Sequence, residues 1–176
     1  MGKRALLIID MQQGLFAVTR HDADGVVTRI NALAERMRNG GSPVIFIQHC
    51  GPEGEDLHPS KPGHAIHRGL SVEPRDIMIA KASCDAFLKT SLSAVLAEND
   101  VQEVIVTGFA TDFCVDTTVR SALAHGYRVT VATDGHTSAD RPNMSVQDVI
   151  DHHHFIWANF VSPVGPARLL QSSDIV

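Results

Sequence analysis

The chain has 176 residues, of which 44% are hydrophobic and 20% charged, and its formal net charge is −5. These values are typical of a single globular domain, 1–176, whose core is large enough to fold without disulfides or a structural metal. The mild acidity argues against a nucleic-acid-binding surface, because such surfaces usually carry a basic patch. With three cysteines, no secretory signal and no apolar run long enough to cross a membrane, we expect a cytoplasmic protein with reduced thiols.

Short apolar runs alternate with helical patterns along the chain, and this alternation is typical of a parallel sheet built from βαβ units. Most of the runs are apolar almost throughout, as expected for strands that are covered on both faces. The predicted strands, in chain order, are 5–9, 43–48, 76–80, 101–107, 128–132 and a weaker 159–161. The predicted helices are 26–37, 91–98, 115–123, 146–157 and a short 166–170, the third of them ended by Gly126.

Segment 50–74 interrupts this pattern, because it is rich in glycine and proline and has no periodicity. A long irregular stretch inside a compact domain is usually functional, and we interpret it as a lid or rim over a site. The alternative is a surface excursion or a contact between subunits.

In an open parallel sheet, ligands bind beyond the carboxyl ends of the strands, so the residues just after each strand are the candidate site residues. Asp10 follows the first strand, Gln48 and His49 the second, Lys81 the third and His136 the fifth. A carboxylate at the end of a buried strand is paired, tuned for proton transfer or used as a helix N-cap. Lys81 either stabilises nearby anions or is a solvated lysine at a strand end.

The turn after the fourth strand, 108–114, leads directly into a predicted helix with Thr111 as its N-cap, which places Cys114 in the first helical turn. Free N–H groups and the helix dipole at such a position lower the pKa of a thiol, and the same N–H groups can bind an oxyanion. The alternative is that Cys114 is a small buried hydrophobic residue.

Three segments are informative together: Leu-Ile-Ile-Asp-Met-Gln at 7–12, Lys81 with the Asp-Ala-Phe at 85–87, and Val-Thr-Gly-Phe-Ala-Thr-Asp-Phe-Cys-Val at 106–115. In this combination they resemble the isochorismatase-like cysteine hydrolases, the superfamily of nicotinamidases and N-carbamoylsarcosine amidohydrolases. The resemblance extends from about residue 4 to residue 161.

The resemblance implies a three-layer α/β/α sandwich around a six-stranded, mostly parallel sheet of order 3-2-1-4-5-6. Cys114 would be the nucleophile, Asp10 the general base and Lys81 the cation that orients the pair. The N–H groups of Ala110 and Cys114 would form the oxyanion hole, beside a cis peptide bond between Phe109 and Ala110. Because this sheet order separates Lys81 from Asp10 by two strands, the loop after the third strand would have to fold back toward the site.

The implied activity is hydrolysis of a small-molecule C–N bond, in an amide, carbamoyl or ureido group, through a thioester-type intermediate. Cys114 favours this activity over vinyl-ether hydrolysis of isochorismate, because members with that activity commonly lack the cysteine. Isochorismatase-type hydrolysis and a non-enzymatic thiol redox sensor on the same fold are the alternatives. By analogy with the family we expect a homodimer or homotetramer.

No cofactor is expected. Metal-containing nicotinamidases carry Asp-x-His after the second strand, whereas Ile-Gln-His-Cys-Gly stands at 47–51 here. An unrelated metal site among the loop histidines is the alternative, formed by His49, His58, His64 and His67.

The substrate pocket is predicted from residues near the proposed catalytic positions. Phe16, Phe87 and Phe113 would form an apolar wall, and Gln48 and His136 would add polar groups. The alternative for each phenylalanine is the core. Cys50 and Cys84 receive no chemical role.

Overall fold

Six strands form one sheet of order β3-β2-β1-β4-β5-β6, and all five pairings are parallel. The computed structural model describes residues 3–175. Its strands are β1 Lys3–Ile9, β2 Val44–His49, β3 Ile77–Lys81, β4 Val101–Phe109, β5 Arg128–Thr137 and β6 Arg168–Leu170. Its α-helices are α1 Ala23–Asn39, α2 Leu92–Glu98, α3 Asp116–Ala124 and α4 Val146–Ala158. The predicted fold and strand order are confirmed.

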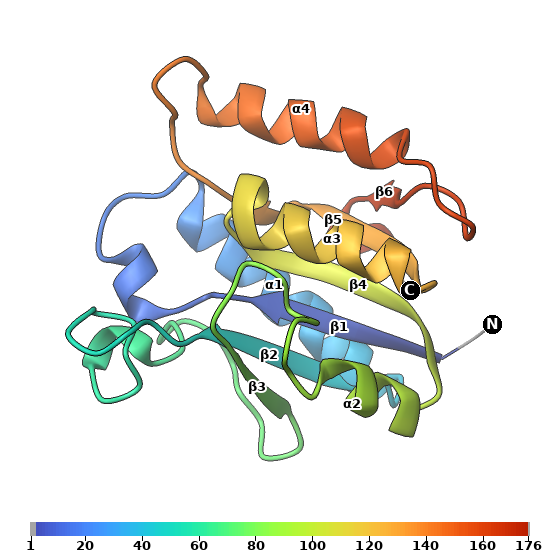
Figure 1. The fold of residues 1–176 in the computed structure, drawn as a ribbon, viewed down its shortest axis with the longest axis horizontal. Helices are drawn as coiled ribbons and strands as arrows, with labels where there is room; N and C mark the ends of the chain where they lie inside the picture. The colour runs from blue at the N-terminus through green and yellow to red at the C-terminus, as the bar shows by residue number, and fades with distance from the viewer. Residues whose placement is uncertain (1–2, 176) are drawn as a thin grey trace.

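Helices cover both faces of the sheet, which explains why its central strands are apolar on both sides (Figure 1). On one face, alternate residues of β1 such as Leu7 and Ile9 pack with residues of α2 and α3 and with Trp157 of α4. On the other face, Leu6 and Ile8 pack with α1, whose apolar residues recur at helical spacing. The three layers therefore bury β1 and β4 at the centre of the molecule.

The sixth strand lies elsewhere than predicted. Residues 159–161 leave α4 as irregular chain, and Val161 is 93% exposed. Residues 168–170, predicted as a short helix, pair instead with Thr130–Ala132 of β5. Pro163, Gly165 and Pro166 lie between the two segments and turn the chain back to the sheet edge. A strand of three residues is too short to show a period of its own.

The turn after β4 also differs from the prediction. Residues Thr111–Val115 form a single π-helical turn, and α3 begins only at Asp116. Thr111 does not cap a helix, because its hydroxyl is hydrogen-bonded to Nδ1 of His136 at 2.8 Å. Gly126 ends α3 as predicted, with a φ of +84°.

Segment 50–74 contains one short 3-10 turn, Pro62–His64, and is tied to the chain that follows β1. The N–H of His67 donates to the carbonyl of Met11 at 2.8 Å. The buried Gln12 amide donates to the carbonyls of His49 at 3.0 Å and His64 at 2.9 Å. Because these bonds hold the segment over the carboxyl end of β1, it forms a wall of the site described below.

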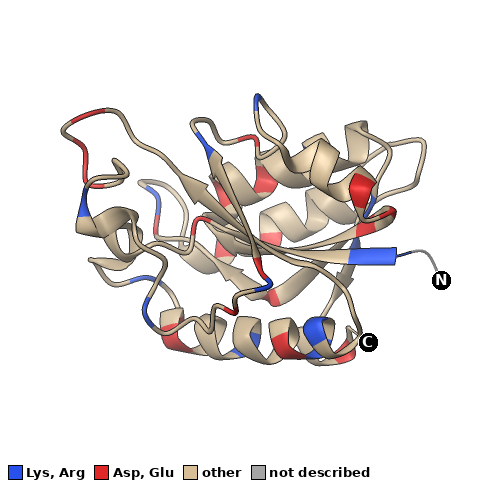
Figure 2. Ribbon diagram, turned by 90° about the horizontal axis from the view of Figure 1, so that it is seen from below, with Lys and Arg blue, Asp and Glu red and all other residues tan. Residues whose placement is uncertain are grey.

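Acidic and basic residues are interspersed along the ribbon (Figure 2). Among residues 3–175, no helix is long and apolar enough to cross a membrane.

Candidate active site

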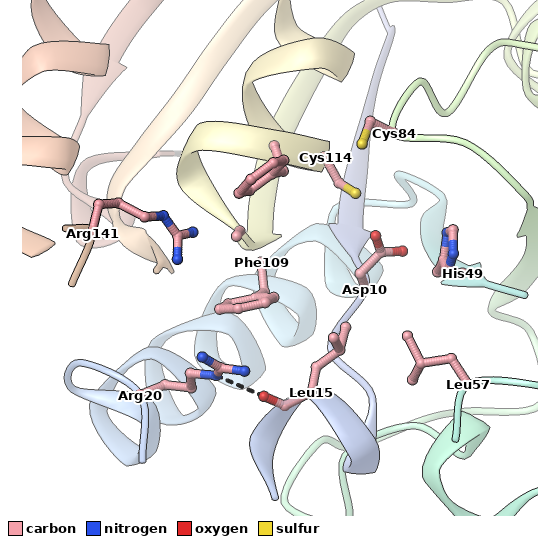
Figure 3. A pocket seen from close by; sticks show the side chains of 11 residues that line it. Asp10, Leu15, Arg20, His49, Leu57, Cys84, Phe109, Cys114 and Arg141 are labelled. Carbon is pink, nitrogen blue, oxygen red and sulfur yellow. Dashed lines mark hydrogen bonds between the residues drawn. The ribbon is translucent and has the colours of Figure 1, made fainter. Parts of the chain in front are cut away.

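A cavity of about 370 Å³ opens at the carboxyl ends of β1, β2 and β4 (Figure 3). Its position agrees with the general rule for ligand sites in open parallel sheets. The residues that line it are Asp10, Leu15, Arg20, His49, Leu57, Cys84, Phe109, Ala110, Phe113, Cys114 and Arg141.

Asp10, Lys81 and Cys114 meet at this cavity. The Nζ atom of Lys81 lies 2.6 Å from Oδ2 of Asp10 and 3.3 Å from Sγ of Cys114, and it also donates to the carbonyl of Ser83 at 2.9 Å. Oδ1 of Asp10 is buried and has no hydrogen-bond partner among the described residues. Figure 3 shows the Asp10 carboxylate and the Cys114 sulfur pointing toward each other. One carboxylate oxygen is thus held by the lysine, and the other is available as a proton acceptor.

Lys81 reaches Asp10 with its own side chain. It is the last residue of β3 and pairs with His49 of β2, so its long side chain crosses β2 to reach the end of β1. The chain after β3 also turns toward the site, because the carbonyl of Ser83 accepts from Lys81 and Cys84 lines the cavity.

The ammonium of Lys81 and the carboxylate of Asp10 form a buried ion pair. Burial raises the pKa of Asp10, and the adjacent Lys81 ammonium offsets only part of that effect. Burial disfavours the charged form of Lys81, yet Asp10 and Cys114 beside it raise its pKa overall. Lys81 therefore holds a positive charge next to Asp10, whose raised pKa makes it a stronger base than an exposed carboxylate.

The electrostatics of Cys114 differ from the prediction. Burial of the thiol raises its pKa, the Asp10 carboxylate raises it further, and Lys81 opposes this shift only in part. The predicted lowering by a helix N-terminus was wrong, because Cys114 lies in the π-helical turn before α3 begins and its thiol is removed from water beside a carboxylate. A thiol whose pKa is raised needs a proton acceptor beside it, and Oδ1 of Asp10 has no other hydrogen-bond partner among the described residues.

The peptide bond between Phe109 and Ala110 is cis, as the family resemblance implied. Ala110 lines the cavity next to Cys114, and both residues belong to the turn that connects β4 with α3. The backbone of this turn is the part of the cavity that could hold an oxyanion.

Of the five predicted pocket residues, the structure places only Phe113 on the cavity, where it is 52% exposed. Phe87 is buried and stacks on His125 with a ring-centroid distance of 4.6 Å, so nearness to Lys81 in sequence did not bring it to the cavity. Gln48 donates to the carbonyl of His64 at 3.0 Å. Phe16 lies behind the cavity wall, packed on Phe109 with a ring-centroid distance of 5.5 Å.

His136 is buried away from the cavity, 2% exposed, between Thr111 and α4. Its Nδ1 lies 2.8 Å from the Thr111 hydroxyl and its Nε2 lies 2.9 Å from Nε2 of His154. Burial lowers the pKa of His136 to about 3, with smaller contributions from His154 and His153. His136 is therefore a neutral residue that supports the turn carrying Cys114.

Sequence reasoning did not identify Arg20, Arg141, Leu15 and Leu57 as cavity residues. Arg141 lies four residues beyond the end of β5. The expectation that ligands bind beyond strand ends therefore indicates this region of the chain but does not single out Arg141 within it. Arg20 and Leu57 stand in irregular segments where no periodicity or motif marks them. His49 and Cys84, which had no predicted catalytic role, also line the cavity.

The loop histidines have separate partners. His58 is hydrogen-bonded to Ser60, His64 lies 3.4 Å from the sulfur of Cys50, and the ring of His67 packs against Phe16. Among residues 3–175, no three His, Cys, Asp or Glu side chains are grouped so that they could hold a metal ion.

Known proteins are similar to this chain in sequence and in fold. The family model for the isochorismatase domain matches residues 4–152. A streptothricin hydrolase from Streptomyces noursei is 34% identical over 79% of this chain and 56% of its own length. Nicotinamidase from Escherichia coli (strain K12) is 30% identical over 77% of this chain and 83% of its own length. The chain spans about half the length of the two streptothricin hydrolases that it matches.

The crystal structure of an isochorismatase family protein superposes with a TM-score of 0.87 at 30% identity, and the match covers 96% of this chain and 98% of that one. The matched residues 4–152 contain Asp10, Lys81 and Cys114. The chain therefore belongs to the isochorismatase family of hydrolases.

Proposed function

We propose that the chain is a cysteine-dependent hydrolase of a small-molecule C–N bond, in an amide, carbamoyl or ureido group. The observation that carries the proposal is the contact of one buried ammonium, Lys81, with both the carboxylate of Asp10 and the sulfur of Cys114 at the cavity. Similar proteins named nicotinamidase and ureidoacrylate amidohydrolase act on amides, which supports the C–N bond as the target.

The first half of the reaction forms a thioester. The free Oδ1 of Asp10 accepts the thiol proton while Sγ of Cys114 attacks the carbonyl carbon, and the carbonyl electrons move onto oxygen. The N–H groups of Ala110 and Cys114 stabilise this oxyanion. When it collapses, the C–N bond breaks and the departing nitrogen takes the proton from Asp10.

The second half restores the enzyme. Asp10 accepts a proton from a water molecule that attacks the thioester carbon, the C–S bond breaks, and the sulfur takes the proton back. Lys81 remains protonated throughout and stabilises whichever neighbour, carboxylate or sulfur, carries the negative charge. General base catalysis of this kind contributes about 10²–10⁴-fold to a rate.

The test is release of ammonia or amine from a panel of small amides, ureas and carbamoyl compounds, with isochorismate included. Wild type is expected to hydrolyse at least one C–N compound, and Cys114→Ala to lose this activity while its circular dichroism is unchanged. Cys50→Ala is the matched control, because Cys50 is a half-buried thiol that does not line the cavity. Near-wild-type turnover by Cys114→Ala would refute the role of the cysteine, and turnover of isochorismate alone would support the vinyl-ether reaction instead.

A further inference from the structure

Two guanidinium groups lie on one side of the cavity. Arg20 comes from the segment between β1 and α1, and Arg141 from the segment between β5 and α4. Figure 3 shows both of them across the cavity from His49, with Phe109 and Cys114 between. Whatever fills the cavity therefore meets the nucleophile at one part of its surface and positive charge at another.

The charge of Arg141 is already neutralised. Its Nε donates to Oδ2 of Asp112 at 2.6 Å and its Nη2 to Oδ1 at 2.9 Å, which is a two-point ion pair. Ser138 donates to the same carboxylate at 2.6 Å, and these contacts, against the effect of burial, lower the pKa of Asp112. Arg141 therefore has a fixed anionic partner inside the protein.

Arg20 has none. Its Nε donates to the carbonyl of Leu15 at 2.7 Å, and this is its one hydrogen bond within residues 3–175. No carboxylate oxygen of the described chain lies within 4.0 Å of its guanidinium nitrogens, and Asp22, two residues further along the chain, is paired with Arg29. Burial lowers the pKa of Arg20 and the charge of Arg141 lowers it further, as expected where no anion compensates.

The guanidinium of Arg20 is nonetheless held in place. Its central carbon lies 4.8 Å from the centroid of the Phe109 ring, so the aromatic face supports it. Both outer nitrogens are left to donate, and a planar fork of this kind matches a carboxylate with two parallel hydrogen bonds. Phe109 also directly precedes Ala110. The same residue therefore supports the Arg20 guanidinium and leads into the turn that carries Ala110 and Cys114.

We infer that Arg20 binds a carboxylate of the substrate, so that the compound hydrolysed is a small amide, carbamoyl or ureido acid rather than a neutral amide. The inference deepens the proposed function and rests on it for the chemistry at Cys114. The single uncompensated positive charge favours a monoanion, and the mostly apolar remainder of the lining accommodates the short carbon chain between the two groups.

Binding without turnover tests the inference. In the Cys114→Ala background, titration calorimetry compares malonamate, succinamate and glutaramate with propionamide, butyramide and pentanamide. Within each pair a methyl group replaces the carboxylate and the amide is retained. At least one acid is expected to bind about tenfold or more tightly than its neutral partner. Arg20→Gln is expected to abolish that preference, and Arg20→Lys to retain part of it.

Arg75→Gln is the matched control, because Arg75 is exposed, pairs with Glu73 and does not line the cavity. It is expected to leave the preference unchanged. Equal binding of acid and amide in all three pairs, or a preference that survives Arg20→Gln, would overturn the inference. If the protein prefers the acids but hydrolyses no C–N compound, the anion site at Arg20 is supported and the proposed reaction is refuted. Turnover of neutral amides alone would support the proposed hydrolysis and refute the role of Arg20 as a carboxylate site.

Discussion

A Cβ atom on Gly108 would lie 2.1 Å from the carbonyl oxygen of Ile9, so β1 and β4 touch backbone to backbone just before Asp10. Gly108 also has a φ of +123°, a conformation that side-chain-bearing residues rarely adopt. This contact fixes the carboxyl end of β1, where Asp10 follows, against the strand that leads to Cys114.

Gly108→Ala is therefore expected to lower the free energy of unfolding by about 3 kcal/mol or more, because overpacking and the unfavourable φ act together. Chemical denaturation measures the loss. Gly126→Ala is the control, since its φ is +84° with nothing within 4 Å of a new Cβ, and it should cost about 1 kcal/mol. Equal losses in the two variants would show that the approach to Ile9 is unimportant.

The activity should fall in acid as Asp10 becomes protonated. Burial raises the pKa of Asp10, and a base must be ionised to accept a proton, so kcat/KM decreases as pH falls through a value above the ordinary 3.8. Lys81→Met removes the cation that offsets this effect. The acid limb of the pH profile should then move to higher pH, and kcat/KM should drop about 10²-fold or more.

Lys3→Met provides the comparison for that variant, because it removes a lysine whose ion pair with Asp100 is exposed. Its pH profile should match that of wild type. An unmoved acid limb in Lys81→Met would mean that a group other than Asp10 governs the profile.

Asp10→Asn should change hydrolysis and thiol ionisation in opposite directions. Hydrolysis is lost because the proton acceptor is gone. The thiol pKa, which burial and then Asp10 raise, should fall once the carboxylate is neutral and Lys81 faces the sulfur alone. Alkylation of Cys114 by iodoacetamide near neutral pH, followed by mass spectrometry, should therefore be faster in Asp10→Asn than in wild type. Slower alkylation would contradict the electrostatics described for this site.

His136 should make the stability depend on pH. Its pKa is about 3 in the folded protein and about 6.5 when unfolded, so the unfolded state binds more protons between these values. The stabilisation is present above pH 6.5 and is lost progressively as pH falls toward 3. Between pH 7 and pH 5, wild type should lose about 2 kcal/mol relative to His136→Gln, as measured by urea denaturation.

The parallel sheet of βαβ units could be predicted because each central strand is a continuous apolar run and the helices have apolar stripes, so local pattern and tertiary burial agree. The order of its strands was implied by the family resemblance. Strand β6 could not be predicted, because its three residues are too few to show a sequence pattern and form a strand only by pairing with β5 at the sheet edge. Asp10 and Lys81 became candidates because polar residues at the ends of buried strands are conspicuous, but only the family resemblance implied that they meet Cys114.

The cavity residues that the sequence did not reveal, and the site predictions that were wrong, depend on which residues lie close together in three dimensions. Arg20 and Leu57 come from irregular segments that meet at the cavity only after the chain has folded. Phe87 is close to Lys81 in sequence but stacks on His125 in the core. The prediction of a lowered thiol pKa for Cys114 was wrong for a related reason. A position just after a strand can be read from the sequence, whereas burial beside a carboxylate cannot.

The ion pair of Asp10 and Lys81 bridges strands that are not neighbours, because β2 lies between β1 and β3. Cys114 joins them from the far side of β1, after β4. The meeting of Asp10, Lys81 and Cys114 thus depends on three separate strand pairings between distant parts of the chain. Turnover during refolding would consequently report completion of this half of the sheet, and a partly folded state lacking any one of these pairings would be silent in the same assay.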